Sequence, residues 1–433
     1  MHDSLFRNEE LFGHPKGLFV LFFTEMWERF SYYGMRALLV YYMVKHLMLP
    51  HAEASHIYGL YTGLVYLTPL FGGILADRVI GQRNAVMLGG VLMAVGHFMM
   101  AWEVLFFPAL GFLILGNGAF KPNISTQVGS LYRPGDARRD RAFSIFYVGI
   151  NLGAFFSPLA CGTLGETYGW HYGFGAAGIG MVIGLGIYVW GREWLAPDTL
   201  AGIYEREKGE VGRRVSAAEK GRVWGLIAIC LISTAFWAAY EQQGNTIAMW
   251  ADASTDRYVF GWEFPASWFQ SLNPAFIFLL TPFITSFWAR QSRKGTEPSA
   301  IGKMAIGCFF LAAGFLVMVP VAAMHGADKM PVHMVWLVLF TFLATIGELF
   351  LSPVGLSLVT KLAPVNMVSM LMGVWFLSSF AGNYVAGYLG HYWEKMGKDL
   401  FFLMVASLAF AAGVGILLLL RPLRRALGVQ EIL

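Results

Sequence analysis

The sequence predicts an all-α polytopic membrane protein with about twelve transmembrane helices, and three observations support this prediction. Of the 433 residues, 57% are hydrophobic and only 13% are charged, whereas a soluble protein carries about 25% charged residues. Apolar runs long enough to cross a bilayer recur along the whole chain, and Lys and Arg gather in alternate connections between them. The net charge of +4 therefore reflects membrane topology, and no nucleic-acid partner is expected.

The apolar runs define the expected spans and the domain organisation. The spans are 17–44, 56–77, 84–102, 105–131, 141–163, 173–191, 222–248, 266–289, 300–323, 332–360, 366–391 and 399–420. We expect an N-terminal six-helix bundle over 1–191, a cytoplasmic linker over 192–222 and a C-terminal six-helix bundle over 223–433. The polar N-terminal stretch lacks the pattern of a cleavable signal peptide, so the first span is expected to be retained.

The distribution of positive charge predicts the orientation of these spans. One set of connections contains Arg78, Arg83, Arg133, Arg138, Arg139, Arg141, the central linker, Arg290, Arg293, Lys294, Lys361, Arg421, Arg424 and Arg425. The alternate set contains only Lys45, Arg257, Lys329, Lys395 and Lys398. Because positive charge concentrates on the cytoplasmic side, we expect the first set and both termini to be cytoplasmic. The expected location is the cell (inner or plasma) membrane, with multiple passes through the lipid bilayer.

The first span carries four charges on one helical face. Glu25, Glu28, Arg29 and Arg36, together with Tyr32, fall within about one third of the helix circumference. Each charge would cost about 2.5–3.5 kcal/mol at the bilayer centre, so this face must look into protein or a wet cavity. Glu25 and Arg29 could form a structural pair at i, i+4 that locks helices together. The alternative, which we favour, is a polar pathway for a charged solute.

Acids outnumber bases within the spans. The deep bases are Arg29, Arg36 and Lys121, and the deep acids are Glu25, Glu28, Glu241 and Glu348. Burial and crowding favour the neutral form of at least one of these carboxyl groups. We therefore hypothesise that one glutamate binds and releases a proton during function; a permanently protonated glutamate is the structural alternative. Sequences typical of hydrolases, such as HExxH, GxSxG or a Walker motif, are absent, so we expect a protein that is not an enzyme and needs no cofactor, with protons as the coupling ion.

Several motifs resemble those of known transporters. The stretch Gly73-Ile-Leu-Ala-Asp-Arg-Val-Ile-Gly-Gln-Arg83 resembles the loop motif of the major facilitator superfamily. The run Phe143-Ser-Ile-Phe-Tyr-Val-Gly-Ile-Asn-Leu-Gly153 and the opening Glu25-x-x-Glu-Arg-Phe30 are similar to motifs of the proton-dependent oligopeptide transporter (POT/PTR2) family within that superfamily. Further resemblances lie at Gly116–Asn123, Phe236–Gln242, Gln270–Pro274 and Gly347–Pro353. The match runs from about Gly13 to the twelfth span.

The resemblance implies a major facilitator fold and a role for each matching residue. It implies that Arg36 and Lys121 hold the carboxylate end of a peptide, while Asn273 and Glu348 hold its amino end. It implies a pocket lined by Tyr33, Tyr66, Asn151, Trp237, Ser352 and Trp375. Proton coupling would involve Glu25, Glu28, Arg29, Glu241 and Glu348. The ion pairs Arg36–Glu241 and Lys121–Glu348 would form and break as a gate between the two bundles.

The chemistry of a peptide agrees with this assignment. A short peptide is a zwitterion whose two charges lie at a variable distance, so a site for many peptides should clamp the termini and contact the side chains loosely. The first bundle supplies the cations Arg36 and Lys121, and the second supplies the acids Glu241 and Glu348. A substrate that replaces pairs between them would link its own binding to gating. One chain contains both bundles, so a monomer is expected to suffice.

We therefore expect a proton-coupled symporter that imports di- and tripeptides by alternating access. The alternatives are a major facilitator carrier of another small anion or of a peptide-like drug, and a receptor that binds peptide without transporting it. Many bacterial members of the resembled family carry two extra helices between the bundles. The segment 192–222 is too short for two spans, so we expect only the basic twelve.

Overall fold

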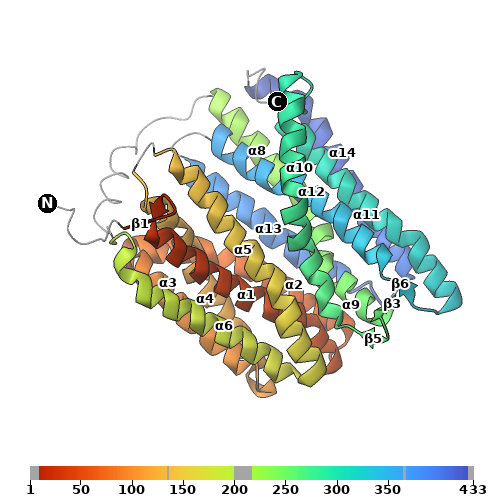
Figure 1. Cartoon of the computed structure of the whole chain (residues 1–433). Coiled ribbons are helices and arrows are strands. Elements are labelled where there is room, and N and C mark those ends of the chain that lie inside the picture. Colours follow the sequence, from red (N-terminus) through yellow and green to blue (C-terminus); the bar gives the residue numbers. More distant parts are fainter. Residues whose placement is uncertain (1–8, 134–135, 199–216, 364–366, 428–433) are drawn as a thin grey trace. The chain divides into compact units, whose positions relative to one another are not determined.

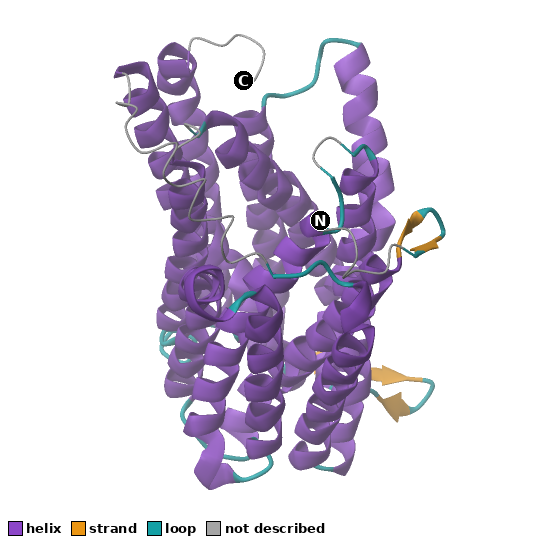
Figure 2. Cartoon of the chain, turned by 90° about the vertical axis from the view of Figure 1, so that its left-hand side faces the viewer, coloured by secondary structure: helices purple, strands orange, loops and turns teal. Residues whose placement is uncertain are grey.

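The computed structural model describes residues 9–133, 136–198, 217–363 and 367–427, and it is almost entirely helical. Figure 2 shows that the few strands are short and lie outside the helices. The chain divides into two compact units, and each is described by itself. Unit 1 comprises Met1–Tyr42 and Leu64–Gly209, and unit 2 comprises Met43–Gly63 and Glu210–Leu433.

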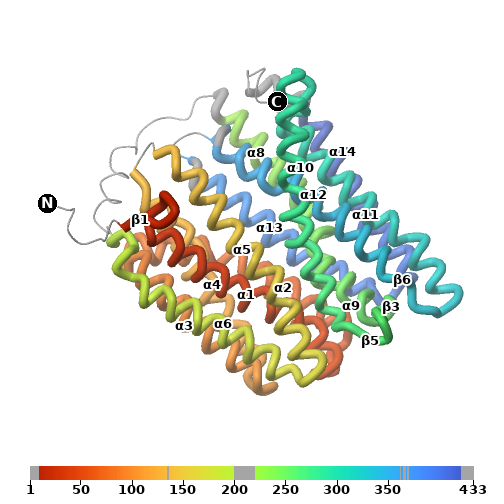
Figure 3. Tube along the Cα trace, in the orientation of Figure 1, coloured from red at the N-terminus to blue at the C-terminus, as the bar shows by residue number. Residues whose placement is uncertain are grey.

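Unit 1 contains the long helices of the first part of the chain. These are α1 (Lys16–Lys45), α2 (His51–Leu75), α3 (Gln82–Met99), α4 (Phe106–Ser130), α5 (Arg138–Thr163) and α6 (Trp170–Trp190), the first two of which end and begin, respectively, in unit 2. Figure 3 follows the chain through this order, from red α1 to yellow-green α6. Helix α3 packs against both α4 and α6. The N-terminal hairpin pairs β1 (Glu10–Leu11) with β2 (His14–Pro15) in antiparallel fashion.

Small residues of the sequence motifs bring the helices of unit 1 together. A Cβ atom at Gly116 of α4 would lie 2.6 Å from Cγ of Met93 in α3, and one at Gly118 would lie 2.7 Å from Cβ of Thr68 in α2. Both distances are too short for a side chain, so glycine is required where α4 touches its neighbours. Gly81 follows a π-helical turn and adopts a φ of 82°, a conformation that glycine adopts without strain.

Unit 2 contains the remaining helices and two further strand pairs. The helices are α8 (Ala217–Tyr240), α9 (Thr246–Ala253), α10 (Leu272–Arg293), α11 (Ala300–Asp328), α12 (Val335–Leu362), α13 (Val368–Gly390) and α14 (Lys398–Leu427). The strands β3 (Thr255–Asp256) and β6 (Val332–His333) pair in parallel, and β4 (Tyr258–Val259) and β5 (Trp262–Glu263) pair in antiparallel fashion. Helix α11 packs against α12 and α14, and the three lie side by side in Figure 1.

The segment Met43–Gly63 packs with the C-terminal helices of unit 2. The Nζ atom of Lys45 lies 2.6 Å from Oδ1 of Asp252, and the hydroxyl of Ser55 donates a hydrogen bond of 2.9 Å to Oδ1 of Asn245. A Cβ atom at Gly59 would lie 2.6 Å from the carbonyl oxygen of Asn383 in α13. The end of α1 is therefore held by α9, and the first half of α2 by α13 and by the turn that precedes α9.

The structure confirms the all-α prediction, because each of the twelve expected spans overlaps a helix in the described residues. Nine helical stretches of these residues are long and apolar enough to cross a membrane. The seventh expected span, 222–248, differs in one respect. Helix α8 ends at Tyr240, a 3-10 turn occupies Glu241–Gly244, and Asn245 leaves the helical region before α9 begins. The domain boundaries 1–191 and 223–433 stay predictions, and much of the linker, 199–216, lies outside the described residues.

Candidate functional site

A compact charged cluster lies on α1 in unit 1. The side chains of Glu25 and Arg29 are each 2% exposed and that of Glu28 is fully buried. Arg29 donates from Nη2 to Oε1 of Glu28 over 2.7 Å and from Nε to Oε2 of the same residue. Its Nε atom also lies 3.2 Å from Oε1 of Glu25. A single guanidinium thus serves two carboxylates, which is the arrangement that makes buried charges tolerable.

The main partner of Arg29 differs from the one that helical spacing suggests. Adjacent side chains on a helix point in different directions, so the i, i+4 pair with Glu25 is the geometric expectation. In the structure both hydrogen bonds of the Arg29 guanidinium are instead donated to Glu28, since the arginine side chain is long enough to fold back along the helix. The second oxygen of Glu25, Oε2, has no hydrogen-bond partner among the described residues.

Helices α4 and α5 enclose this cluster. The amide of Asn117 in α4 donates to Oε1 of Glu28 over 3.4 Å. A Cβ atom at Gly153 of α5 would lie 2.9 Å from Cβ of Arg29 and 2.9 Å from the backbone nitrogen of Phe30. The glycine of the fifth-span motif therefore lets α5 approach the charged turn of α1 closely.

Two further cations of unit 1 lie against aromatic rings. The Nζ atom of Lys121 is 4.7 Å from the ring centroid of Tyr66, and Cζ of Arg36 is 6.0 Å from that of Tyr33. Both are cation–π contacts. The predicted residue Asn151 is 4% exposed and donates to the carbonyl of Tyr147 over 3.0 Å.

The carboxylate of Glu348 in α12 is the centre of a second cluster, in unit 2. Its Oε2 atom accepts a hydrogen bond of 2.5 Å from the hydroxyl of Tyr240 and one of 2.9 Å from the amide of Asn273. The same amide lies 3.0 Å from the Tyr240 hydroxyl and 3.1 Å from the hydroxyl of Thr345. Three helices, α8, α10 and α12, therefore contribute neutral side chains around one carboxylate.

The structure also describes the surroundings of the other predicted residues of unit 2. The rings of Trp237 and Tyr240 meet edge to face at 5.7 Å, and Trp237 is 8% exposed. Trp375 of α13 is 3% exposed and fills the space over Gly355, where a Cβ atom would come within 3.0 Å of its ring. Glu241 is 2% exposed and begins the 3-10 turn between α8 and α9. Ser352 is half-buried, one helical turn after Glu348.

Sequence reasoning missed three residues that the structure places in these clusters. Asn117 binds Glu28, and Tyr240 and Thr345 bind the group around Glu348. Asn117 and Tyr240 fall inside the motif stretches Gly116–Asn123 and Phe236–Gln242. Thr345 lies two residues before the stretch Gly347–Pro353. The predicted gating pairs Arg36–Glu241 and Lys121–Glu348 each have one member in each unit, and they stay predictions. No group of three or more His, Cys, Asp or Glu in the described part of the chain could hold a metal ion.

Comparison with known proteins identifies the family. The model of the POT family (PTR2) matches residues 83–202 and 200–404 of this chain. The chain belongs to the POT family. The two matches meet at residues 200–202, inside the predicted linker 192–222.

Named relatives of the POT family cover nearly the whole chain. The peptide transporter YePEPT of Yersinia enterocolitica subsp. palearctica is 38% identical over 495 aligned positions, which cover 96% of this chain and 95% of that protein. The di-/tripeptide transporter of Lactococcus lactis subsp. cremoris is 33% identical, with 96% of this chain and 97% of that protein covered. A crystal structure of the peptide transporter POT in complex with sulfate is 35% identical, with a TM-score of 0.89 and 98% of each chain covered.

These findings confirm the family and the fold expected from the motifs. The structural neighbours have the major facilitator fold, and the chain is a multi-pass helical membrane protein. The named relatives are transporters, so the chain is a transporter and not an enzyme. Because 495 aligned positions exceed the 433 residues of this chain, YePEPT contains residues that have no counterpart here.

Proposed function

We propose that this protein is a proton-coupled symporter that imports di- and tripeptides by alternating access. The observation that carries the proposal is the buried cluster on α1, in which Arg29 serves both Glu28 and Glu25. One oxygen of Glu25 has no hydrogen-bond partner among the described residues, so a proton can be added there without breaking a hydrogen bond. The names of the relatives in Yersinia and Lactococcus support a peptide as the substrate.

The peptide termini are assigned to opposite ends of the site. The carboxylate end is assigned to Lys121 and Arg36, two cations of unit 1 that lie against the rings of Tyr66 and Tyr33. Glu348 and Asn273 form a polar group suited to an ammonium, which needs acceptors from the carboxylate and the amide oxygen. Tyr33, Tyr66, Asn151, Trp237, Ser352 and Trp375 are proposed to line the site. Glu241 is proposed as a further coupling residue and as the gating partner of Arg36.

The orientation and the partners complete the proposal. We assign both termini and the central linker to the cytoplasm on the distribution of Lys and Arg. The proton is the coupling ion, no cofactor takes part, and one chain suffices. An inside-negative potential then drives uptake with about 2.3 kcal/mol per charge per 100 mV.

Accumulation of labelled dialanine in proteoliposomes tests this proposal. We expect wild-type protein to concentrate dialanine when an inside-negative potential or an inward pH gradient is imposed. We expect Glu28→Gln to exchange internal for external dialanine, which requires a folded carrier, but to lose gradient-driven accumulation. Binding without net flux would assign the protein as a receptor.

A second candidate is a carrier of peptide-like compounds. A crystal structure of a mutant of the peptide transporter POT with alafosfalin is 36% identical to this chain, with a TM-score of 0.88. Competition by alafosfalin with dialanine uptake would place such compounds in the same site. Uptake of alafosfalin without any uptake of dialanine would replace the peptide proposal.

A further inference from the structure

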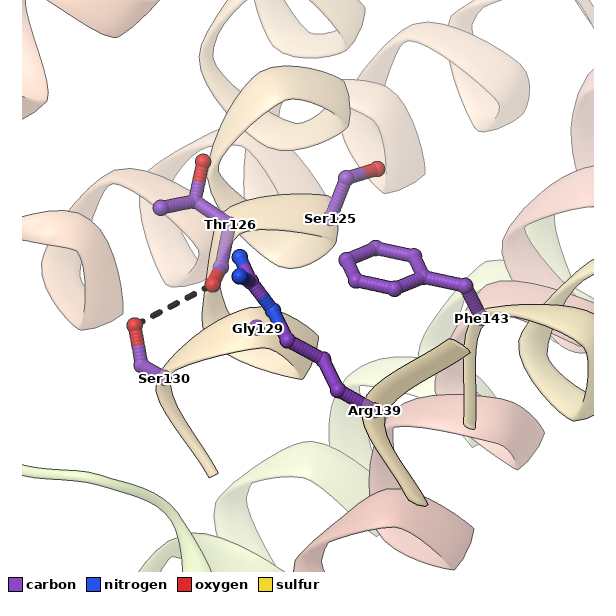
Figure 4. A pocket seen from close by; sticks show the side chains of 6 residues that line it. All are labelled: Ser125, Thr126, Gly129, Ser130, Arg139 and Phe143. Carbon is purple, nitrogen blue, oxygen red and sulfur yellow. Dashed lines mark hydrogen bonds between the residues drawn. The ribbon is translucent and has the colours of Figure 1, made fainter. Parts of the chain in front are cut away.

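A pocket of about 400 Å³ opens beside the last turns of α4 and the first turns of α5 in unit 1. It is lined by Ser125, Thr126, Gly129, Ser130, Arg139 and Phe143, which Figure 4 shows as sticks. None of these six residues belongs to the substrate site proposed above. The pocket therefore needs an explanation of its own.

Among the described residues, Arg139 is the only charged one that lines this pocket. Its guanidinium crosses Gly129, where a Cβ atom would lie 3.0 Å from Nη2, and its Cζ atom lies 5.9 Å from the ring centroid of Phe143. The side chain of Arg139 forms no hydrogen bond or ion pair with any residue in the described part of the chain. The preceding Arg138, by contrast, binds Asp136 over 2.9 Å and Glu10 over 2.8 Å. The fork of Arg139 thus remains open to an anion.

The hydroxyl groups of the pocket are oriented as acceptors. Ser125 donates to the carbonyl of Lys121 over 3.2 Å, Thr126 to that of Pro122 over 2.9 Å, and Ser130 to that of Thr126 over 3.1 Å. The last of these bonds is the dashed line in Figure 4. Since each proton is already engaged, the oxygen lone pairs are what the hydroxyls offer to a ligand. A cation beside several acceptors complements a zwitterion, whereas a simple phosphate would need further donors.

The pocket begins one helical turn after Lys121 on α4. Asn117, Lys121, Ser125 and Gly129 follow one another at intervals of four residues, so they form a stripe that winds about 40° around α4 at each step. The stripe begins at the hydrogen bond between Asn117 and Glu28 and ends beneath Arg139. Lys121 and Gly129 are separated by about 12 Å along the helix axis. The stripe therefore connects Lys121 to Gly129, the residue that the guanidinium of Arg139 crosses.

We propose that this pocket is a second peptide subsite on the release side of the transporter. Arg139 binds the carboxylate of a peptide that has left Lys121, and the hydroxyls of Ser125, Thr126 and Ser130 accept hydrogen bonds from its ammonium group. This inference rests on the proposed function and on the cytoplasmic assignment of the connection between α4 and α5.

Dialanine exchange measured separately at the two membrane faces tests the subsite. Inside-out and right-side-out membrane vesicles that contain unlabelled dialanine are given labelled dialanine at increasing concentrations. We expect Arg139→Gln to raise the half-saturating concentration at the cytoplasmic face by about fivefold, as for an exposed charge-assisted hydrogen bond, and to leave the opposite face unchanged within about twofold. We expect Arg139→Lys to lie between the wild type and Arg139→Gln.

Arg141→Gln is the matched control, because Arg141 is exposed on the same helix, carries the same charge and does not line the pocket. We expect it to leave the half-saturating concentration of dialanine unchanged at both faces. If Arg139→Gln and Arg141→Gln raise the half-saturating concentration equally, the effect comes from surface charge alone and the subsite is overturned. A raised half-saturating concentration for Arg139→Gln at both faces, or at the opposite face alone, would also overturn the subsite. Wild-type vesicles that exchange no dialanine would instead contradict the proposed function.

A phosphatidylethanolamine headgroup is also a zwitterion and is the competing occupant. The wild type and Arg139→Gln are therefore reconstituted into phosphatidylcholine alone and into phosphatidylcholine with phosphatidylethanolamine. We expect the difference between the two proteins to persist in phosphatidylcholine alone. A difference that appears only with phosphatidylethanolamine present would assign the pocket to lipid and overturn the proposal.

Discussion

In unit 1 the carboxylate of Glu28 accepts hydrogen bonds from the guanidinium of Arg29, whereas in unit 2 that of Glu348 accepts them from the neutral side chains of Tyr240 and Asn273. A guanidinium compensates charge as well as donating hydrogen bonds, so its loss leaves buried charge without compensation. A neutral donor contributes hydrogen bonding alone, so its loss costs less. The hydrogen bonds described here thus come from a charged donor at the buried Glu28 and from neutral donors at the half-buried Glu348.

The largest expected effect follows from removing the shared cation of unit 1. Arg29→Gln leaves Glu25 and Glu28 buried beside each other without the guanidinium, and we expect a loss of about 3–5 kcal/mol of stability. Thermal unfolding of the purified protein in detergent measures this loss. Arg139→Gln removes an exposed arginine of the same unit and should change stability by less than about 0.5 kcal/mol. Equal losses in the two variants would contradict the role given to Arg29.

A smaller effect is expected from the packing that surrounds the cluster. In Gly153→Ala the new methyl group would meet Arg29 and Phe30 of α1 at 2.9 Å, so we expect a loss of about 2 kcal/mol. Gly175→Ala in α6 is the control, since nothing lies within 4 Å of the added atom. Alanine is the better helix former, so this control should gain about 0.5 kcal/mol. Thermal unfolding of both variants checks the opposite signs.

In unit 2 the expected effect is on substrate binding as well as stability. Tyr240→Phe removes one donor from Glu348, and we expect a loss of about 1 kcal/mol of stability and a rise of about fivefold in the KM for dialanine. Tyr188→Phe removes the hydrogen bond of 2.9 Å to Gln127 in unit 1 and serves as the control. It should lose similar stability and keep its KM. A raised KM in both variants would mean that Tyr240 acts through the fold alone.

The smallest effect concerns a carboxylate outside the spans. The ammonium of Lys303, at 2.5 Å, lowers the pKa of Glu297 below its ordinary value. Because the pKa is lower in the folded state, the pair stabilises the protein above the unfolded-state pKa of about 4.5, and this contribution is lost as the pH falls through the folded-state pKa. The group is largely solvated, so we expect less than about 0.5 kcal/mol. The unfolding temperature should fall between pH 6 and pH 3, and this fall should be slightly smaller for Glu297→Gln than for the wild type. A fall in Glu297→Gln that equals or exceeds that of the wild type would contradict the pairing.

The helices could be predicted from the sequence because an apolar run of about twenty residues has few alternatives in a membrane. The break in the seventh span was missed, although Gly244-Asn245 is a dipeptide typical of turns. The apolar residues of α9 continue the run beyond the break, so a hydropathy profile shows one continuous span.

The contacts of the candidate-site residues could not be predicted from the sequence. Helical spacing suggests the pair Glu25–Arg29, yet which carboxylate receives the fork of Arg29 depends on how α4 and α5 pack around α1. The same limit applies to Tyr240 and Thr345. They bind the group around Glu348 because α8, α10 and α12 converge there, and spacing along a single helix carries no information about neighbouring helices.

Proton entry that accompanies peptide uptake tests the central claim most directly. Proteoliposomes are loaded with the pH-sensitive dye pyranine, an inside-negative potential is imposed with potassium and valinomycin, and dialanine is added outside. The proposal predicts that the lumen acidifies when dialanine is added to the wild type, and that it does not acidify without dialanine or with Glu28→Gln. Accumulation of dialanine by the wild type without acidification would contradict proton coupling and leave a carrier driven by another gradient.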